Sequence, residues 1–202
     1  RVIENLGMEF DKEYMFILIC LQEDFDKYDF TEFEKVIGHN SYDVVILDDV
    51  TEGAAQTVLT AKDLINDDTP LMTMNSDQLV EWDVVDLFED CKRFDALIPC
   101  FYGEGNAWSY ARCGQDGYVE EVAEKKQISE YATAGYYYWS KGSDFVKYAE
   151  QMIEDNSRTN GEFYVAPVYN WAIKDGKKIG VFMVDKLHSL GTPEDLKEYL
   201  NG

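Results

Sequence analysis

The 202-residue sequence has few of the side chains that build zinc sites, disulfide frameworks or surfaces for polyanions. It contains two histidines and four cysteines, and no cysteines form a C-x-x-C pair. We therefore expect no zinc site, and reduced thiols as in a cytoplasmic protein. Lysine and arginine number 18 against 40 aspartates and glutamates, a formal net charge of −22. That charge opposes binding to nucleic acid or to an anionic membrane, but a divalent cation and a few lysines can still admit a small phosphorylated substrate.

Long hydrophobic runs are also missing. The longest, residues 15–21, is far shorter than the about 20 residues that span a bilayer, and the N-terminus has no signal-peptide pattern, so we expect no membrane insertion. With four prolines and no low-complexity tract, the chain predicts a single domain over residues 1–202. It starts at Arg1, and residues 2–7 resemble the end of a helix closed by a glycine. We therefore expect a fragment of a longer product.

Apolar segments alternate with helical patterns through the first half of the chain. Strands are expected at 14–21, 42–47 and 70–75, and helices at 31–37, 53–65 and 84–93. In the second half, strands are expected at 95–102, 108–112, 118–123, 134–139 and 178–184. The helices there are expected from an N-cap at Ser143 to 153, over 161–174, and after an N-cap at Thr192. This order predicts an α/β fold with a mixed, mostly parallel sheet covered by helices on both faces.

The apolar run at residues 71–74 stops abruptly at Asn75-Ser76-Asp77-Gln78. A carboxylate at the end of a buried strand is a common position for a metal ligand, because ligands of α/β proteins collect at the carboxyl edge of the sheet. Asp77 is therefore the first candidate for holding a divalent cation. The alternative is a plain strand-to-helix cap, since Asn, Ser and Asp are good N-cap residues.

Six segments resemble, in order along the chain, those of sugar nucleotidyltransferases, in particular a bacterial subgroup found with capsule and surface-polysaccharide genes. The segments are Thr51-Glu52-Gly53-Ala54-Ala55-Gln56-Thr57-Val58-Leu59, residues 70–78, Trp108-Ser109-Tyr110-Ala111, Glu121-Val122-Ala123-Glu124-Lys125-Lys126, Gly161-Glu162-Phe163-Tyr164-Val165-Ala166-Pro167 and Leu190-Gly191-Thr192-Pro193-Glu194-Asp195-Leu196. The resemblance implies a GT-A-like (Rossmann-like) nucleotide-binding sandwich. It also implies a magnesium-dependent reaction between a nucleoside triphosphate and a sugar phosphate, or a similar phosphorylated compound, that releases pyrophosphate.

The resemblance also assigns roles on the nucleotide side. Asp77 is expected to be the Mg²⁺ ligand and a catalytic residue, with Asn75 and Gln78 positioning that site. A hard oxygen donor suits this ion, which usually takes one or two protein carboxylates. Gly53 and Ala54 match the small residues that let the backbone approach the base. Small residues at a helix start equally suit close helix packing.

On the substrate side, Glu124 and Lys125 match a pair that faces the sugar and the phosphate in the family. A lysine is a suitable point charge for a phosphate, so Lys125 is the second predicted catalytic residue. The alternative for Lys125 is a solvated side chain on a hairpin. Glu162 matches a carboxylate near the sugar, although a glutamate at a helix N-terminus is also favoured by the helix dipole. Gly135 matches a glycine that lines the sugar pocket, while the aromatics after it are expected in the core.

Two departures from the family pattern are visible. Many relatives carry a second metal-binding aspartate where this chain has Ser189, and Asp185 or His188 could substitute for it. The family also opens with a strand and a Gly-rich loop that cradles the triphosphate, and nothing similar precedes Arg1. Without that strand, an exposed face or a gap is expected in the sheet.

Two other functions remain open at this point. A GT-A glycosyltransferase would hold a metal with an Asp-x-Asp motif, of which Leu47-Asp48-Asp49 and Asn75-Ser76-Asp77 are imperfect versions. A catalytically incomplete domain that binds nucleotide would explain the missing loop. The base, the phosphorylated acceptor and the oligomeric state do not follow from the sequence.

Overall fold

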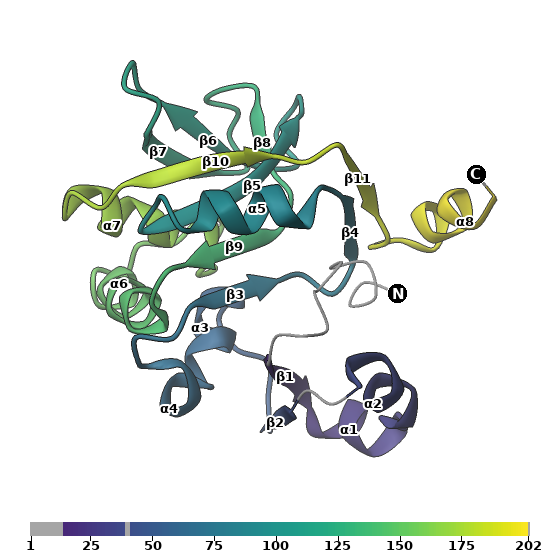
Figure 1. Cartoon of the computed structure of the whole chain (residues 1–202). Coiled ribbons are helices and arrows are strands. Elements are labelled where there is room, and N and C mark those ends of the chain that lie inside the picture. Colours follow the sequence, from purple (N-terminus) through teal and green to yellow (C-terminus); the bar gives the residue numbers. More distant parts are fainter. Residues whose placement is uncertain (1–13, 39–40, 202) are drawn as a thin grey trace.

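A seven-stranded mixed sheet forms the centre of the structure, a computed structural model that describes residues 14–38 and 41–201 (Figure 1). The helix end predicted at residues 2–7 lies outside the described residues. The strand order is β3-β9-β5-β8-β6-β7, with β10 beside β5. These strands are β3 (Leu71–Met74), β5 (Ala96–Tyr102), β6 (Ser109–Cys113), β7 (Val119–Glu124), β8 (Tyr131–Thr133), β9 (Tyr136–Trp139) and β10 (Ile179–Met183).

Two smaller sheets accompany the central one. β1 (Met15–Leu21) pairs in parallel with β2 (Ser41–Leu47), and β4 (Gln78–Glu81) pairs antiparallel with β11 (Lys186–Ser189). Within the described ranges, β1 makes no ladder with β3, and Figure 1 shows the β1–β2 pair apart from the central sheet. This separation agrees with the gap expected from the sequence.

The predicted mixed α/β class is confirmed, but the expectation of a mostly parallel sheet is wrong. Among the described pairings only β1–β2 and β5–β10 are parallel, and all the others are antiparallel. The physical reason lies in the connections. A short turn joins β6 to β7, which pair as an antiparallel hairpin, whereas a parallel pair needs a long crossover. The sequence analysis did not foresee β4, β8 or β11.

Helices cover both faces of the central sheet because β5 is apolar on both sides. Leu97 packs with Leu87 and Cys91 on one face, and Ile98 packs with the α6–α7 core on the other, as expected for successive residues of a strand. The helices are α1 (Gln22–Lys27), α2 (Thr31–Ile37), α3 (Ala54–Leu59), α4 (Lys62–Ile65), α5 (Val84–Cys91), α6 (Gly142–Glu154), the 3-10 turn η2 (Ala166–Val168), α7 (Tyr169–Lys174) and α8 (Pro193–Asn201).

The core is centred on aromatic side chains of β9 and α7. Trp139 stacks on Tyr169 with ring centroids 4.4 Å apart. The Tyr169 hydroxyl donates to the backbone oxygen of Tyr138 at 3.2 Å, so its polar atom is satisfied inside the core. The prediction that the aromatics after Gly135 form core is confirmed, since the whole of β9 is buried.

Three predicted helix limits are wrong, one because of a local side-chain bond and two because a distant backbone contact replaces a local signal. The helix expected over 53–65 divides into α3 and α4 where the Thr60 hydroxyl bonds back to the Thr57 oxygen at 2.7 Å. Ser143 is not an N-cap, because α6 begins at Gly142 and the Ser143 amide donates to the Asp67 oxygen instead. The helix expected from residue 161 starts only at Ala166, since the Phe163 backbone bonds to the backbone of Glu52 and Ala55 instead.

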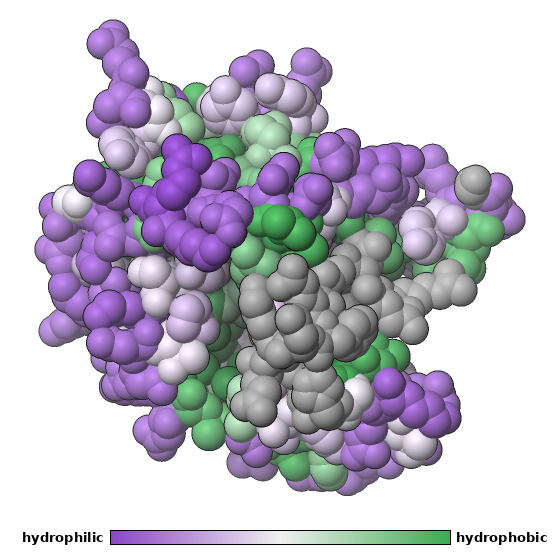
Figure 2. Space-filling model, in the orientation of Figure 1, coloured by the Kyte–Doolittle hydropathy of each residue, from purple (hydrophilic) through white to green (hydrophobic). Residues whose placement is uncertain are grey.

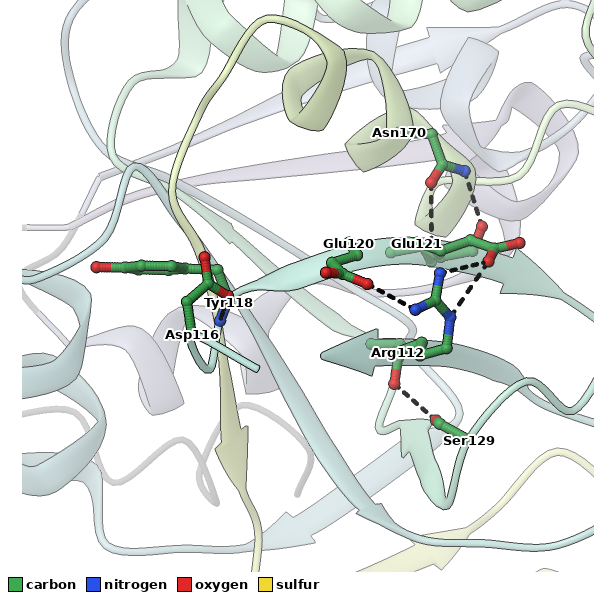
Figure 3. Close-up of polar contacts among 9 residues, drawn as sticks. Arg112, Asp116, Tyr118, Glu120, Glu121, Ser129 and Asn170 are labelled. Atoms are coloured by element: carbon green, nitrogen blue, oxygen red, sulfur yellow. Dashed lines mark hydrogen bonds and ion pairs between the residues drawn. The ribbon is translucent and has the colours of Figure 1, made fainter. Parts of the chain in front are cut away.

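A side-chain clamp holds β7, the edge strand that ends at Glu124. The Asn170 side chain on α7 accepts from the Val122 amide at 2.9 Å and donates to the Val122 oxygen at 2.7 Å, as a neighbouring strand would. On the other side, Arg112 of β6 reaches Glu120 at 2.6 Å and Glu121 at 3.0 Å (Figure 3). The end of β7 is therefore fixed from both sides.

The surface is dominated by polar and charged residues. Figure 2 shows a mainly hydrophilic face with hydrophobic residues gathered toward its middle, in keeping with the formal charge of −22. Over the described part of the chain, no helix has the length and apolar character needed to cross a bilayer.

Replacing Asn170 by alanine is expected to lower the free energy of unfolding by about 2 kcal/mol, because two backbone groups of Val122 lose their partners. Urea unfolding measures the change. Asn201→Ala is the matched control, since the Asn201 side chain makes a single exposed bond to the Lys197 oxygen and its loss is expected to cost no more than about 0.5 kcal/mol. Equal effects of the two substitutions would contradict the clamp.

Candidate functional site

The turn after β3 brings three predicted site residues together. The Asn75 amide donates to the Gly135 oxygen at 2.9 Å, and the Asn75 side chain donates to Gln78 Oε1 at 3.1 Å. Gly135 has a φ of 78°, and a Cβ there would run into the Gln78 side chain and lie 2.9 Å from Asn75 Nδ2. Gly135 is therefore required both by its backbone conformation and by the two amides beside it. The turn leads into β4, so the alternative of a strand-to-helix cap is wrong.

Asp77 lies in the same turn and meets the C-terminal motif. Its backbone oxygen accepts from the Leu190 amide at 2.7 Å. A Cβ on Gly191 would lie 2.9 Å from Asp77 Oδ2, so this glycine leaves room beside the exposed carboxylate. The Ser189 hydroxyl, at the position of the expected second aspartate, donates to Asp195 at 3.1 Å. The structure therefore places Asp77 next to the motif in which this chain has Ser189 at the position of the expected second aspartate.

The predicted capping box at Thr192 is present. The Asp195 amide donates to the Thr192 hydroxyl at 3.1 Å, and the Thr192 amide donates to the Asp195 carboxylate at 3.2 Å. Asp195 thus ties Ser189 to the start of α8 and brings a second carboxylate to this end of the sheet. His188, one of the two residues suggested as a substitute ligand, pairs with Glu81 at 2.7 Å instead.

Gly53 sits against the segment that carries Glu162. The Phe163 amide donates to the Glu52 oxygen, and the Ala55 amide donates to the Phe163 oxygen, both at 2.9 Å. A Cβ on Gly53 would lie 2.5 Å from the Phe163 backbone, and Gly53 has a φ of 136°. The guanidinium of Arg158 covers the Phe163 ring at 3.9 Å and pairs with Glu52 at 2.8 Å. The loop at Gly53, predicted to contact the base, and the segment that carries Glu162 are thus packed against each other. Ala54, the first residue of α3, is exposed.

Lys125 stands between the two glutamates predicted on the substrate side. It has a φ of 53°, and its amide donates to the Trp108 oxygen at 3.0 Å. Its ammonium donates to the Tyr164 hydroxyl at 2.6 Å. The hydrogen bond to Tyr164 and the nearby charges of Glu124 and Glu162 raise the pKa of Lys125, which stays a cation. The structure therefore brings Glu124, Lys125 and Glu162 together.

The Glu124 side chain is half-buried and receives a hydrogen bond from the Ser109 hydroxyl. Burial raises the pKa of Glu124, while Ser109 and Lys125 lower it and Glu162 raises it. Behind Ser109 lies the Tyr137 hydroxyl, which is 3.0 Å from the Thr133 hydroxyl. Thr133 and Tyr137 flank Gly135, so the same short segment contacts Asn75 and supports Glu124.

Magnesium fits the donor set at Asp77. Within residues 14–38 and 41–201 no three His, Cys, Asp or Glu side chains converge as a metal site. Mg²⁺ usually takes one or two protein carboxylates and completes its shell with phosphates and water, so Asp77 with the space beside Gly191 is a sufficient protein contribution. A shallow groove between α3 and α6, lined by residues such as Gln56 and Glu150, contains none of the predicted site residues.

Sequence reasoning assigned no role to Ser109, Tyr164 or Asp195. Ser109 and Tyr164 lie inside motifs used for the resemblance, and each contacts a predicted residue through the fold. The one local signal for Ser109 was a hydroxyl at the start of a strand, beside the apolar residues that follow it. Asp195 was recognised only as a helix cap.

Comparisons with known proteins identify a family and a shared fold. Residues 15–200 match the family described as Nucleotidyl transferase. No curated protein sequence matches the chain. A nucleoside-diphosphate-sugar pyrophosphorylase from Vibrio cholerae RC9 has a TM-score of 0.84 at 20% identity, covering 99% of this chain and 85% of that one.

Two further solved structures are similar. A UDP-glucose pyrophosphorylase complexed with UDP-glucose has a TM-score of 0.73 at 16% identity, covering 99% of this chain and 85% of that one. HddC from Yersinia pseudotuberculosis has a TM-score of 0.65 at 15% identity, covering 98% and 81%. At these identities the likeness shows the fold.

Gly53→Ala is expected to lower the free energy of unfolding by about 3 kcal/mol, because the new Cβ meets backbone atoms of Phe163 that cannot move independently. Gly176→Ala is the matched control: Gly176 has a φ of 80° but open space around it, so only backbone strain of about 1 kcal/mol is expected. Urea unfolding of both variants makes the comparison. A Gly53 variant no less stable than the Gly176 variant would show that the close approach to Phe163 is absent.

Proposed function

Because the chain belongs to the nucleotidyl transferase family, we propose that it joins a nucleoside triphosphate to a sugar phosphate, or a similar phosphorylated compound, and releases pyrophosphate. The observation that carries the proposal is the grouping of two sets of side chains around one segment. Asp77 and Asn75 share the turn whose backbone bonds to Gly135. Glu124 and Glu162 lie near Lys125, and Glu124 also lies near Tyr137, two residues after Gly135. A reaction between two phosphorylated substrates needs both sets.

The reaction requires alignment and charge neutralisation rather than a protein nucleophile. An oxygen of the substrate phosphate attacks the α-phosphorus, a new P–O bond forms, and the bond to the β-phosphate oxygen breaks as pyrophosphate leaves. Mg²⁺, when bound, neutralises charge on the nucleotide phosphates. In our proposal Asp77 holds that ion, and Asn75 and Gln78 fix the turn that carries Asp77.

Lys125 is the proposed partner of the attacking phosphate. It is exposed, and its hydrogen bond to Tyr164 at 2.6 Å keeps the ammonium at a fixed place beside Glu124. A lysine ammonium binds a phosphate as a point charge, so it can move from the Tyr164 hydroxyl to the substrate without changing its protonation. The two neighbouring glutamates are proposed to accept hydrogen bonds from hydroxyl groups of the substrate.

Gly53 and Ala54 are the proposed contact with the base. The absence of a side chain at Gly53 lets the loop pack on Phe163, and the small side chain of Ala54 leaves its exposed surface open to a flat ligand. The motif resemblance supports a product used for surface polysaccharides. The four free cysteines suit a reducing, cytoplasmic compartment, where such precursors are made.

The test follows pyrophosphate release by the full-length protein with Mg²⁺, a panel of nucleoside triphosphates and a panel of sugar 1-phosphates. Asp77→Asn keeps the side-chain shape but removes the charge, and we expect kcat/KM to fall about a hundredfold or more. Asp63→Asn, an exposed carboxylate on α4, is the control and is expected to leave the rate unchanged.

Three results would contradict the proposal. No release of pyrophosphate with any pair of substrates would remove the activity itself. Full activity of Asp77→Asn would remove the role of Asp77. Consumption of a nucleotide sugar without release of pyrophosphate would instead identify a glycosyltransferase.

A further inference from the structure

Two buried polar side chains stand out in the described part of the chain. Ser109 is 8% exposed and Thr133 is 3% exposed, and the other side chains of the core are apolar or aromatic. Polar groups are costly to bury without partners, so their position in the core calls for a specific contact. Both belong to the group of hydroxyls that ends at Glu124.

The hydroxyls of Thr133, Tyr137 and Ser109 lie near one another in the core, and Ser109 contacts Glu124. Thr133 Oγ1 and the Tyr137 hydroxyl are 3.0 Å apart, and both side chains are buried. Ser109, whose hydroxyl donates to Glu124, lies near enough to Tyr137 to lower the pKa of its phenol. Burial raises the pKa of Tyr137 to about 12, so its hydroxyl keeps its proton and remains able to donate.

We propose that Ser109 is a positioning residue for the reaction: its buried hydroxyl donates to the Glu124 carboxylate and fixes it so that the free oxygen accepts a hydrogen bond from a hydroxyl group of the phosphorylated substrate. The inference rests on the proposed function for its substrate, but the fixing of Glu124 by Ser109 does not. The substrate class that fits is a phosphorylated compound with a free hydroxyl beside the phosphate, because an ionised carboxylate only accepts hydrogen bonds.

The direction of the hydrogen bond from Ser109 to Glu124 determines its effect on the carboxylate. An ionised carboxylate only accepts hydrogen bonds, so Ser109 donates to Glu124. A hydrogen bond to a charged acceptor is strengthened by the low local dielectric of a buried position. The ionised form of Glu124 is thereby favoured against the burial that opposes it.

The other charged groups that face Glu124 are Lys125, which also favours its ionised form, and Glu162, which opposes it. Removing the Ser109 hydroxyl takes away one of the two groups that lower the pKa of Glu124, while burial and Glu162 remain. The sign is therefore fixed: without Ser109 the pKa of Glu124 moves upward, and the neutral form persists to higher pH. A purely structural role for Ser109 predicts no such shift.

The first experiment measures the titration of the Glu124 carboxyl by ¹³C NMR in the protein without substrates, with the signal assigned through Glu124→Gln. We expect an upward shift of the pKa in Ser109→Ala, a smaller one in Tyr137→Phe, and the original pKa in Ser109→Thr, which restores the hydroxyl. Tyr138→Phe is the matched control: Tyr138 is the next residue of β9, its side chain is also buried, and it packs on the opposite face with Leu87.

The second experiment measures pyrophosphate release by the same variants. Because Glu124 is no longer fixed in Ser109→Ala, KM for the phosphorylated substrate is expected to rise about tenfold with KM for the triphosphate unchanged. The acidic limb of the pH–rate profile is expected to move to higher pH.

Each outcome decides a different point. An unchanged Glu124 pKa in both Ser109→Ala and Tyr137→Phe would overturn the proposal, and the Tyr137 variant keeps this test valid if the Ser109 variant does not fold. An equal rise of both KM values would overturn the assignment to the phosphorylated substrate. A shifted pKa in a protein that releases no pyrophosphate would support the positioning role and contradict only the proposed function.

Discussion

The antiparallel pairing of β9 with β3 is the interaction on which the site depends. The ladder from Leu71–Trp139 to Met74–Tyr136 ends where the Asn75 amide meets the Gly135 oxygen, so the turn that carries Asp77 is fixed by the last bond of a buried sheet. The same segment continues inward as Tyr137, which supports Ser109. A shift of this register by one residue would move every side chain of β9 to the other face and separate both halves of the site.

A second backbone contact joins the remaining parts. Phe163 receives and donates hydrogen bonds to the loop before α3, so Glu162 cannot move without Gly53. The edge strand β7 has no further strand beside it in the described chain, and Asn170 takes that place. Under the proposed function, the two substrate-binding parts are therefore connected through backbone rather than through flexible side chains, which would limit the reorganisation needed before reaction.

Local signals in the sequence predicted what local forces determine. The strand at β3 and the capping box at Thr192 follow from apolar patterning and from a Thr-x-x-Asp spacing, and both were found. Contacts between distant segments were not predictable in this way. The pairing of β4 with β11 joins Gln78 to Ser189, and Phe163 breaks an expected helix because Glu52 binds its amide. The contact of Ser109 with Glu124 could not be predicted from the sequence, because it depends on the pairing of β6 with β7, which places the two residues opposite each other.

The central claim is that the Thr133–Tyr137 segment holds the two halves of one nucleotidyl-transfer site. The most direct measurement is a crystal structure of the full-length protein with Mg²⁺ and a nucleoside diphosphate sugar, the class of product that the reaction would form. The account predicts the ion at Asp77, the diphosphate between Asp77 and Lys125, and a hydroxyl of the sugar on Glu124. A ligand bound elsewhere, as in the groove between α3 and α6, with Asp77 and Glu124 left untouched, would contradict it.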